Sequence, residues 1–407
     1  MKKVILGIAL AAILAFTAYA QRYCPESDFT AVPIDGGRAV RITAYVGNSW
    51  QVNIPSRIRN IPVTHIGERA FYSSNLISVT IPNSVIHIET AAFARNQLTS
   101  VTIPNSVSTI GISAFAVNQL SNVTIGNSVT EIRQGAFAFN QLTSVVIPNS
   151  VTYLNGFNRN RLTSITIPNS VTYIGNTAFE ANLSLQTITF APGSRLETIG
   201  GSRSWNTRYR EWVGFGAFQH TSLYEITIPD SVASIGAHAF FNAGLTSIII
   251  PNSVTSIGSH VFADNHLTSV TIPNSITSIS NNAFAYNQLT NITIPNNVTY
   301  IGANAFAYNQ LTNVTIPDSV TSINFGAFGS NNLTSISIGN SVTGIRGGVF
   351  RNNLLTSVTV PGSVAYIMRG AFTQNQLTEV FIQRGAPLRI EGTLTEVFGS
   401  NVTLTSR

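Results

Sequence analysis

The stretch LTSVTIPNSVSTIGISAFAVNQ, residues 98–119, decides the fold, because the same pattern recurs along most of the 407-residue chain. Its phenylalanine, Phe115, has equivalents on both sides that are 22 residues apart, except for one spacing of 20 and one of 39 residues. A repeat this regular predicts a stacked array of similar units and not a set of separate globular domains. The 14 equivalent residues are Phe71, Phe93, Phe115, Phe137, Phe157, Phe179, Phe218, Phe240, Phe262, Phe284, Phe306, Phe328, Phe350 and Phe372.

The apolar positions of this row predict how one unit is built. Strand alternation points Ser100 and Thr102 outward and Val101 and Ile103 inward. Pro104 cannot donate to a strand ladder, so it ends the strand, and Gly111 permits a corner. One row cannot bury enough apolar surface to offset the ordering of its own backbone, so the rows must stack. The inward positions are Leu98, Val101, Ile103, Val107, Ile110 and Phe115.

Asparagines form two further columns along the repeat. Asparagine can satisfy backbone groups that a turn leaves unpaired, so we expect both columns to stabilise corners of the array. The alternative is a stripe of side chains that binds a ligand. The first column, three residues after the phenylalanine, is Asn96, Asn118, Asn140, Asn160, Asn182, Asn265, Asn287, Asn309, Asn331, Asn353 and Asn375. The second begins with Asn83 and Asn105 and has Asp230 and Asp318 as substitutes.

These residues resemble the BspA-like bacterial leucine-rich repeats, whose unit is L-x-x-I-x-I-P-x-x-V-x-x-I-G-x-x-A-F-x-x-C. The match runs from Phe71 to Leu377, with asparagine where the family usually has cysteine, and residues 28–71 are similar to the family's N-terminal capping segment. The resemblance implies a leucine-rich-repeat solenoid, mainly β with short helical turns, with about 14 rows of 22 residues. It also implies a parallel sheet on the concave side, and a secreted or surface protein that takes part in adhesion.

The ends of the chain complete the predicted organisation. Lys2 and Lys3 precede an apolar run, Val4–Phe16, which is too short to span a bilayer, and a small-x-small site follows at Ala18–Ala20. The only cysteine, Cys24, is either a lipid-anchor residue or a lone thiol. We therefore predict a signal peptide at 1–20, an N-terminal cap at 21–66, the solenoid at 67–376 with an insertion near 201–214, and a C-terminal cap at 377–407.

Departures from the repeat are the candidate binding residues. The insertion holds two of the three tryptophans, and tryptophan, tyrosine and arginine dominate binding hot spots. The alternative is a bulge whose aromatic side chains fold back onto the solenoid. The outward strand positions offer small uncharged side chains that can bond a glycan or an extended peptide, although threonine is also simply a good strand former. The predicted partner-binding residues are Arg203, Trp205, Arg208, Tyr209, Arg210, Trp212, Asn291, Thr293, Asn313 and Thr315.

Catalytic and metal chemistry find little support in this sequence. The only lysines, Lys2 and Lys3, lie in the leader, which excludes P-loop and Schiff-base chemistry in the rest of the chain. The pairs His65 and His87, and His238 and His260, are 22 residues apart and should stack, but no column of acids completes a metal site, so we expect exposed polar residues there. The thin positive charge forms no phosphate-binding stripe. We expect no enzyme, no cofactor and no nucleic-acid partner.

The sequence thus favours an exported, non-catalytic binding protein that adheres to proteins or glycans on host or neighbouring cells. The alternative is a structural scaffold that contacts other envelope proteins. We expect a location at the cell surface or outside the cell, with the periplasm as a further option and no transmembrane segment. The oligomeric state stays open.

Overall fold

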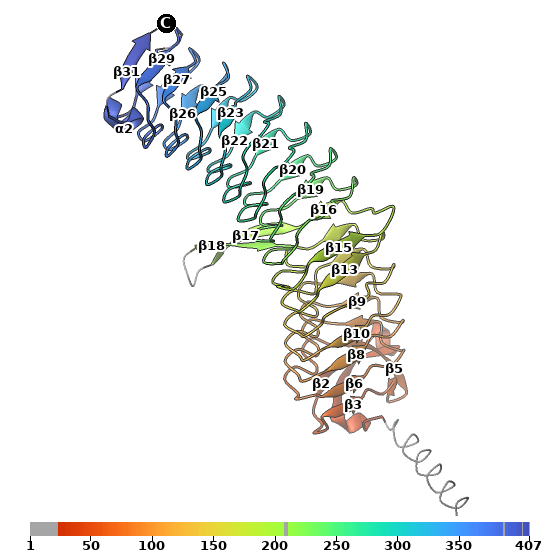
Figure 1. Cartoon of the computed structure of the whole chain (residues 1–407). Coiled ribbons are helices and arrows are strands. Elements are labelled where there is room, and N and C mark those ends of the chain that lie inside the picture. The colour runs from red at the N-terminus through yellow and green to blue at the C-terminus, as the bar shows by residue number, and fades with distance from the viewer. Residues whose placement is uncertain (1–22, 207–210, 386, 401, 407) are drawn as a thin grey trace, which may run out of the picture. The chain divides into compact units, whose positions relative to one another are not determined.

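The repeated rows of the sequence form a β-solenoid of about 16 coils in the computed structural model of the chain. The structure describes residues 23–206, 211–385, 387–400 and 402–406, with only the backbone at 203–206 and 211–214. The predicted signal peptide at 1–20 lies outside these residues. The chain divides into two compact units, Met1–Ser150 and Val151–Arg407. Within each unit the coils follow one another in chain order (Figure 1).

Each coil has three edges, as the row 98–119 shows. The first edge is strand β8 (Ser100–Thr102), where Val101 is buried between exposed neighbours, as the alternation predicts. The second edge is strand β9 (Thr109–Ile110). The third edge is the turn around Phe115, whose N–H donates to the carbonyl of Ala136 in the next coil (2.7 Å). This coil therefore has backbone hydrogen bonds to neighbouring coils on all three sides.

The second edge carries the most regular ladder of parallel strands. In the first unit its strands are β5 (Ile61–Ile66), β7 (His87–Ile88), β9 and β11 (Glu131–Ile132). In the second unit one run is β12 (Tyr153–Leu154), β14 (Tyr173–Ile174), β16 (Thr198–Ile199), β19 (Ser234–Ile235) and β20 (Ser256–Ile257). A second run is β21 (Ser278–Ile279), β22 (Tyr300–Ile301), β24 (Ser322–Ile323), β26 (Gly344–Ile345), β28 (Tyr366–Ile367) and β30 (Arg389–Ile390).

The first edge, where the sequence predicts the sheet, also pairs in parallel, but in short separate ladders. They are β3 (Gln51–Asn53) with β6 (Ser78–Thr80), and β8 with β10 (Asn122–Thr124), in the first unit. The second unit has β13 (Ser164–Ile167) with β15 (Thr187–Phe190), β23 (Asn313–Thr315) with β25 (Ser335–Ser337), and β27 (Ser357–Val360) with β29 (Glu379–Ile382) and β31 (Thr403–Ser406).

Proline and glycine explain this difference between the two edges. A proline such as Pro104 follows most first-edge strands and has no N–H to extend the ladder. At the second edge, a Cβ on Gly111 would lie 2.6 Å from the carbonyl carbon of Glu89, so glycine lets adjacent coils approach closely there. The leucine-rich-repeat solenoid is confirmed, but the more continuous ladder lies on the segment that returns from the predicted strand.

Turns replace the short helical segments that we expected in the rows. Between Gln51 and Ile390 the described residues contain no helix. On the third edge Ser113 and Val117 both have positive φ, 53° and 58°, and flank the buried Phe115. Left-handed residues at these two points interrupt the right-handed helical path, so the segment stays a pair of tight turns.

Stacked phenylalanines fill the interior of each unit. In the first unit the centroids of Phe93 and Phe115 lie 5.0 Å apart with planes 10° from parallel. In the second unit Phe284, Phe306 and Phe328 are spaced 5.5 and 5.4 Å apart. All of these rings are fully buried. The apolar column is thus shared between coils, as the stacking argument from the sequence predicts.

The buried asparagine column stabilises the third edge. Asn118 Oδ1 accepts from the N–H of Leu98 (3.0 Å), and its Nδ2 donates to the carbonyls of Phe93 (3.0 Å) and Phe115 (3.1 Å). The same bonds recur in both units, for example at Asn309. These amides are used inside the molecule, so the structural interpretation of this column is confirmed and the ligand-binding alternative is wrong.

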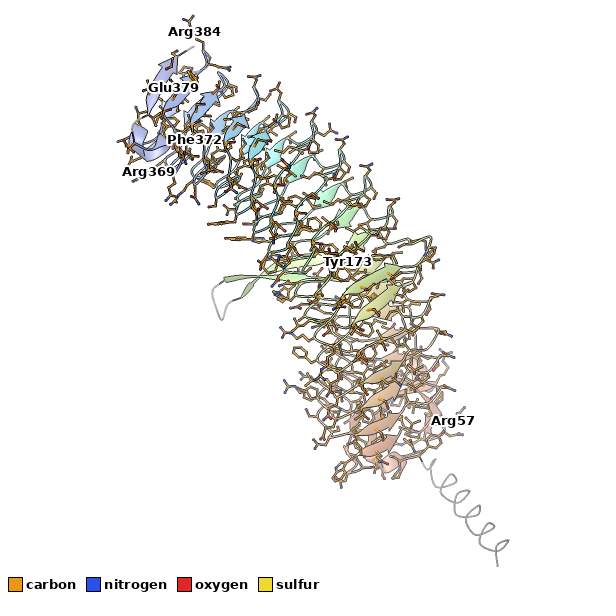
Figure 2. All side chains as sticks on the ribbon, viewed as in Figure 1. Arg57, Tyr173, Arg369, Phe372, Glu379 and Arg384 are labelled. Carbon is orange, nitrogen blue, oxygen red and sulfur yellow. The ribbon has the colours of Figure 1, made fainter. Side chains whose placement is uncertain are left out.

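Separate elements cover the two ends of the array. At the N-terminal end η1 (Glu26–Asp28) leads into an antiparallel hairpin of β1 (Phe29–Ile34) and β2 (Ala39–Tyr45), with η2 (Asp35–Gly37) at its turn. Strand β2 pairs with β5 and so joins the hairpin to the second edge. The short strand β4 (Arg57–Ile58) also pairs with β5. At the C-terminal end α2 (Leu394–Phe398) places Phe398 5.5 Å from Phe372. Figure 2 shows Phe372 among the coils and Arg384 at their outer edge.

Candidate functional site

The insertion near 201–214 forms an antiparallel hairpin of strands β17 (Gly201–Asn206) and β18 (Glu211–Gly216), which projects from the coils (Figure 1). Its register places Trp205 opposite Trp212 and Arg203 opposite Gly214. The side chains of Arg203, Trp205 and Trp212 lie outside the described residues. The predicted residues Arg208, Tyr209 and Arg210 also lie outside them.

The base of the hairpin packs closely on the next coil. A Cβ at Gly201 would overlap the carbonyl oxygen of Ala237, and one at Gly216 would overlap that of His238, so only glycine fits at either position. Directly after the hairpin the chain rejoins the core, where Phe218 stacks on Phe179 at 5.5 Å. The hairpin is therefore an addition to the coil that leaves the phenylalanine column intact.

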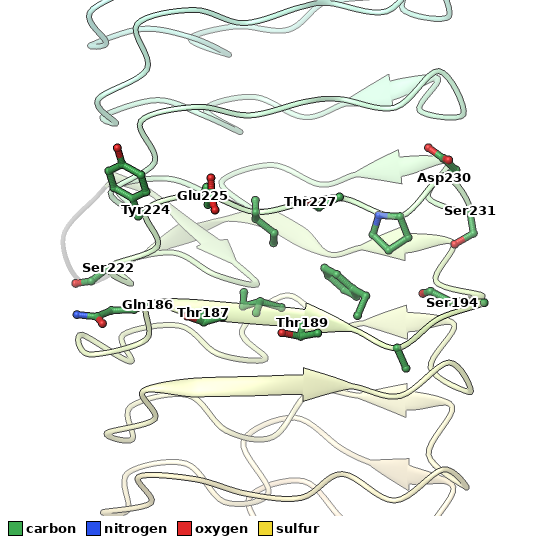
Figure 3. Close-up of a pocket in the computed structure, with 16 residues that line it drawn as sticks. Gln186, Thr187, Thr189, Ser194, Ser222, Tyr224, Glu225, Thr227, Asp230 and Ser231 are labelled. Atoms are coloured by element: carbon green, nitrogen blue, oxygen red, sulfur yellow. The ribbon is translucent and has the colours of Figure 1, made fainter.

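A cavity of about 1060 Å³ opens on the first edge of the same coil, between β15 and residues 222–231 (Figure 3). The turn after β15 is two residues longer than in the row 98–119, since Phe190 and Leu196 are six apart where Ile103 and Val107 are four apart. Among the described residues, no backbone hydrogen bond joins 187–190 to 224–228. The strand ladder is thus open at this point.

The cavity combines an apolar floor with an acidic rim. Ile188 and Ile226 are buried beneath it, whereas Tyr224, Glu225 and Asp230 are exposed around it (Figure 3). No lysine or arginine lines it. An open strand edge can pair with an extended polypeptide, and carboxylates nearby favour a segment that carries basic side chains.

The predicted strand-face residues are all exposed. Asn313 and Thr315 lie on β23, on either side of the buried Val314, while Asn291 and Thr293 lie in an equivalent segment that is not a strand. They occupy the first edge, several coils beyond the hairpin. The hairpin instead leaves the solenoid between its second and third edges. The structure does not bring these two predicted sets of residues together.

The two histidine pairs stack as their spacing predicts. The ring centroids of His65 and His87 are 4.7 Å apart, and those of His238 and His260 are 4.6 Å apart. His238 is only 7% exposed and packs 5.7 Å from the Phe241 ring, so the expectation of exposed polar residues is wrong there. The rings of Phe241 and His260 cover it. The described residues contain no group of three or more side chains suited to a metal ion.

None of the helices in the described part of the chain is both long and apolar enough to cross a membrane.

Comparison with known proteins supports the repeat. The sequence model of the family described as "BspA type Leucine rich repeat region" matches in six copies, over residues 48–156, 154–203, 211–331 and 299–389. A leucine-rich repeat protein from Bacteroides ovatus is 22% identical with a TM-score of 0.64, over 93% of this chain and 98% of that one, which shows a shared fold. No curated protein matches the chain in sequence.

Two further solved structures are similar over most of their length. One is a leucine rich cell surface protein from Faecalibacterium prausnitzii, 22% identical over 94% of this chain and 98% of that one, with a TM-score of 0.45. The other is the pneumococcal vaccine antigen PcpA, 17% identical over 90% of this chain and 97% of that one, with a TM-score of 0.48.

Proposed function

The chain belongs to the BspA-type leucine-rich repeat family, and from that premise we propose that it is an exported binding protein that adheres to proteins or glycans on host or neighbouring cells. The family suggests a binding or adhesion role, and its solenoids are generally non-catalytic interaction scaffolds. The leader-like residues 1–20, with Lys2, Lys3 and the apolar run behind them, support export.

The observation that carries this proposal is the coil that departs from the repeat on two sides. Most coils use the amide of one buried asparagine to bond to the neighbouring coil, so that column is not available to a partner. The coil with the hairpin β17–β18 adds an aromatic and arginine-rich segment on one side and an open strand edge on the other. Both departures leave the phenylalanine column unbroken, as expected of additions that serve binding.

We assign the anchoring role to the hairpin. Tryptophan supplies a large contact area at low entropic cost, and arginine is enriched at binding hot spots, so Trp205, Trp212 and the arginines between them would hold the partner. The strand-face residues Asn291, Thr293, Asn313 and Thr315 would add hydrogen bonds along the first edge. Because these two regions lie apart in the fold, they would contact an extended partner or two separate ones.

Replacement of residues 203–212 by a short Gly-Ser turn tests the proposal, because Gly201 and Gly216 then still close the hairpin base. We expect at least a tenfold loss of binding to immobilised extracellular-matrix proteins and to whole bacterial cells. A matched variant, Asn291→Ala with Asn313→Ala, tests the strand face alone. Unchanged binding by a hairpin variant with the wild-type circular dichroism and melting temperature would remove the hairpin from the proposed site.

Protease treatment of intact cells separates this function from an envelope scaffold. A surface adhesin is shaved from the cell and adhesion is lost with it. A scaffold inside the envelope survives the same treatment until the outer layer is permeabilised, and that result would favour the structural role.

A further inference from the structure

Two exposed tyrosines form an aromatic platform on the third edge of the second unit. Tyr286 and Tyr308, each two residues after a core phenylalanine, stack with centroids 4.4 Å apart and planes 6° from parallel. They are 52% and 50% exposed. The equivalent residue of the next coil is Ser330, so no third ring covers the far face of Tyr308. An open aromatic face thus borders that coil.

A groove of about 540 Å³ begins at this face, and its floor is made of glycine. Gly326, Gly329, Gly347 and Gly348 lie on two consecutive coils and contribute no side chain. A Cβ on Gly348, at φ 71°, would meet nothing closer than 3.8 Å, whereas the equivalent residue two coils earlier is Asn304. The hollow therefore exists because side chains present in neighbouring rows are missing here.

The groove has one more aromatic wall and a cationic, amide-rich rim. Phe325 is about half exposed, and the guanidinium of Arg346 lies 5.4 Å from its ring centroid. Arg351 Nε donates to Gln374 Oε1 (3.0 Å), and Asn352 Nδ2 donates to Ser330 Oγ. No acidic residue lines the groove, and none of the ion pairs among the described residues involves Arg346 or Arg351.

We propose that this groove binds a glycan whose sugars carry a carboxylate or sulfate group. A sugar ring packs its C–H face against an aromatic ring, which the open face of Tyr308 provides. The amides of Asn352 and Gln374 bond hydroxyl groups, and the guanidinium of Arg351 pairs with the acidic group in a planar, two-bond contact. The volume lies within the range of small-ligand sites, whereas a folded protein partner needs roughly 800 Å² of surface.

This site goes beyond the proposed adhesive function and does not depend on the hairpin. The hairpin variant described above should retain glycan binding in full. Loss of one activity with retention of the other separates the two proposals.

The test uses a printed array of neutral, sialylated, uronate-containing and sulfated oligosaccharides, followed by calorimetry with the best binder. The variants Tyr308→Ser, Gly348→Asn and Arg351→Ala each copy the residue that an adjacent or nearby coil has at the same position, so they should fold. The control Phe139→Ser removes a half-exposed aromatic residue at the equivalent position of the first unit.

We expect the wild type to retain acidic glycans, each groove variant to bind them at least tenfold more weakly, and the control to bind like the wild type. Binding of no glycan overturns the proposal. Equal binding by wild type and groove variants places any glycan elsewhere and also overturns it. Retention of neutral and acidic glycans to the same extent, unchanged in Arg351→Ala, refutes the acidic part.

Discussion

Removal of one buried asparagine amide, in the variant Asn309→Ala, tests how the third edge is held together. Asn309 is 8% exposed. Its Oδ1 accepts from the N–H of Leu289 (3.0 Å), and its Nδ2 donates to the carbonyls of Phe284 (2.9 Å) and Phe306 (3.1 Å). Alanine leaves the Leu289 N–H without an acceptor, whereas the carbonyls of Phe284 and Phe306 keep bonds from Asn287 Nδ2 (3.2 Å) and Asn331 Nδ2 (3.0 Å). A buried group that loses its partner costs about 1–3 kcal/mol and each further lost hydrogen bond about 0.5–1.5 kcal/mol, so we expect a loss of about 2–6 kcal/mol.

The chain itself offers the matched comparison for this variant. Thr221 occupies the equivalent position of another coil, and its hydroxyl donates to the carbonyl of Phe218 (2.8 Å). Asn309→Thr can restore one of the three bonds, so we expect its stability to lie between those of alanine and the wild type. The exposed Asn313→Ala should change the free energy of unfolding by less than about 0.5 kcal/mol.

Urea unfolding followed by circular dichroism measures these free energies, and amide hydrogen exchange at Leu289 locates the loss. Long repeat arrays can depart from two-state unfolding, so both probes are needed. A loss below about 1 kcal/mol for Asn309→Ala, or equal stability of the alanine and threonine variants, would refute the reasoning.

Three other predictions follow from the packing and the charges. Phe306→Ala removes a fully buried ring that stacks on both neighbours, and urea unfolding should show a loss of about 3–5 kcal/mol; a loss below about 1 kcal/mol would contradict the shared core. Gly111→Ala puts a Cβ 2.6 Å from the carbonyl carbon of Glu89, so the same assay should show a loss of about 1–3 kcal/mol in the free energy of unfolding. No loss would mean that the coils can move apart at the second edge without cost. Burial and the neighbouring His87 lower the pKa of His65 below its ordinary value of 6.5. The folded state then binds a proton more weakly than the unfolded state, so the free energy of unfolding falls as the pH drops through 6.5. The variant His65→Gln should show a smaller change of this free energy with pH. The same pH dependence in both proteins would exclude His65 as its source.

Much of the coil could be predicted from the row 98–119. Strand alternation correctly separates the buried Val101 from the exposed Thr102, and the repeat spacing places Phe115 in the shared core. The second-edge ladder at Thr109–Ile110 was missed, because two residues are too few to show an alternating pattern. The partners of Asn118 also could not be read from sequence, since they lie in two different coils.

The candidate sites were less accessible to sequence reasoning. The hairpin stands out by its tryptophans, but the structure describes its backbone and not those side chains. The groove at Tyr308 was missed, although two signals were present: Tyr286 and Tyr308 are 22 residues apart, and the column that holds Asn304 changes to glycine at Gly326 and Gly348. A glycine contributes to a cavity only once its neighbours are placed, which is why the hollow required the structure.

The uniform contact between coils has a consequence for how the length of this chain can vary. Since Phe284, Phe306 and Phe328 meet their neighbours in the same way, a tandem duplication or deletion of whole rows in the gene rejoins the protein at an interface that it already uses. A change of another length keeps the rings in register only where a turn absorbs it, as the hairpin β17–β18 does between Phe179 and Phe218. Recombination can therefore lengthen or shorten such a protein in steps of one row without a new core having to evolve. Each step changes the distance between a binding surface on one coil and the end of the array.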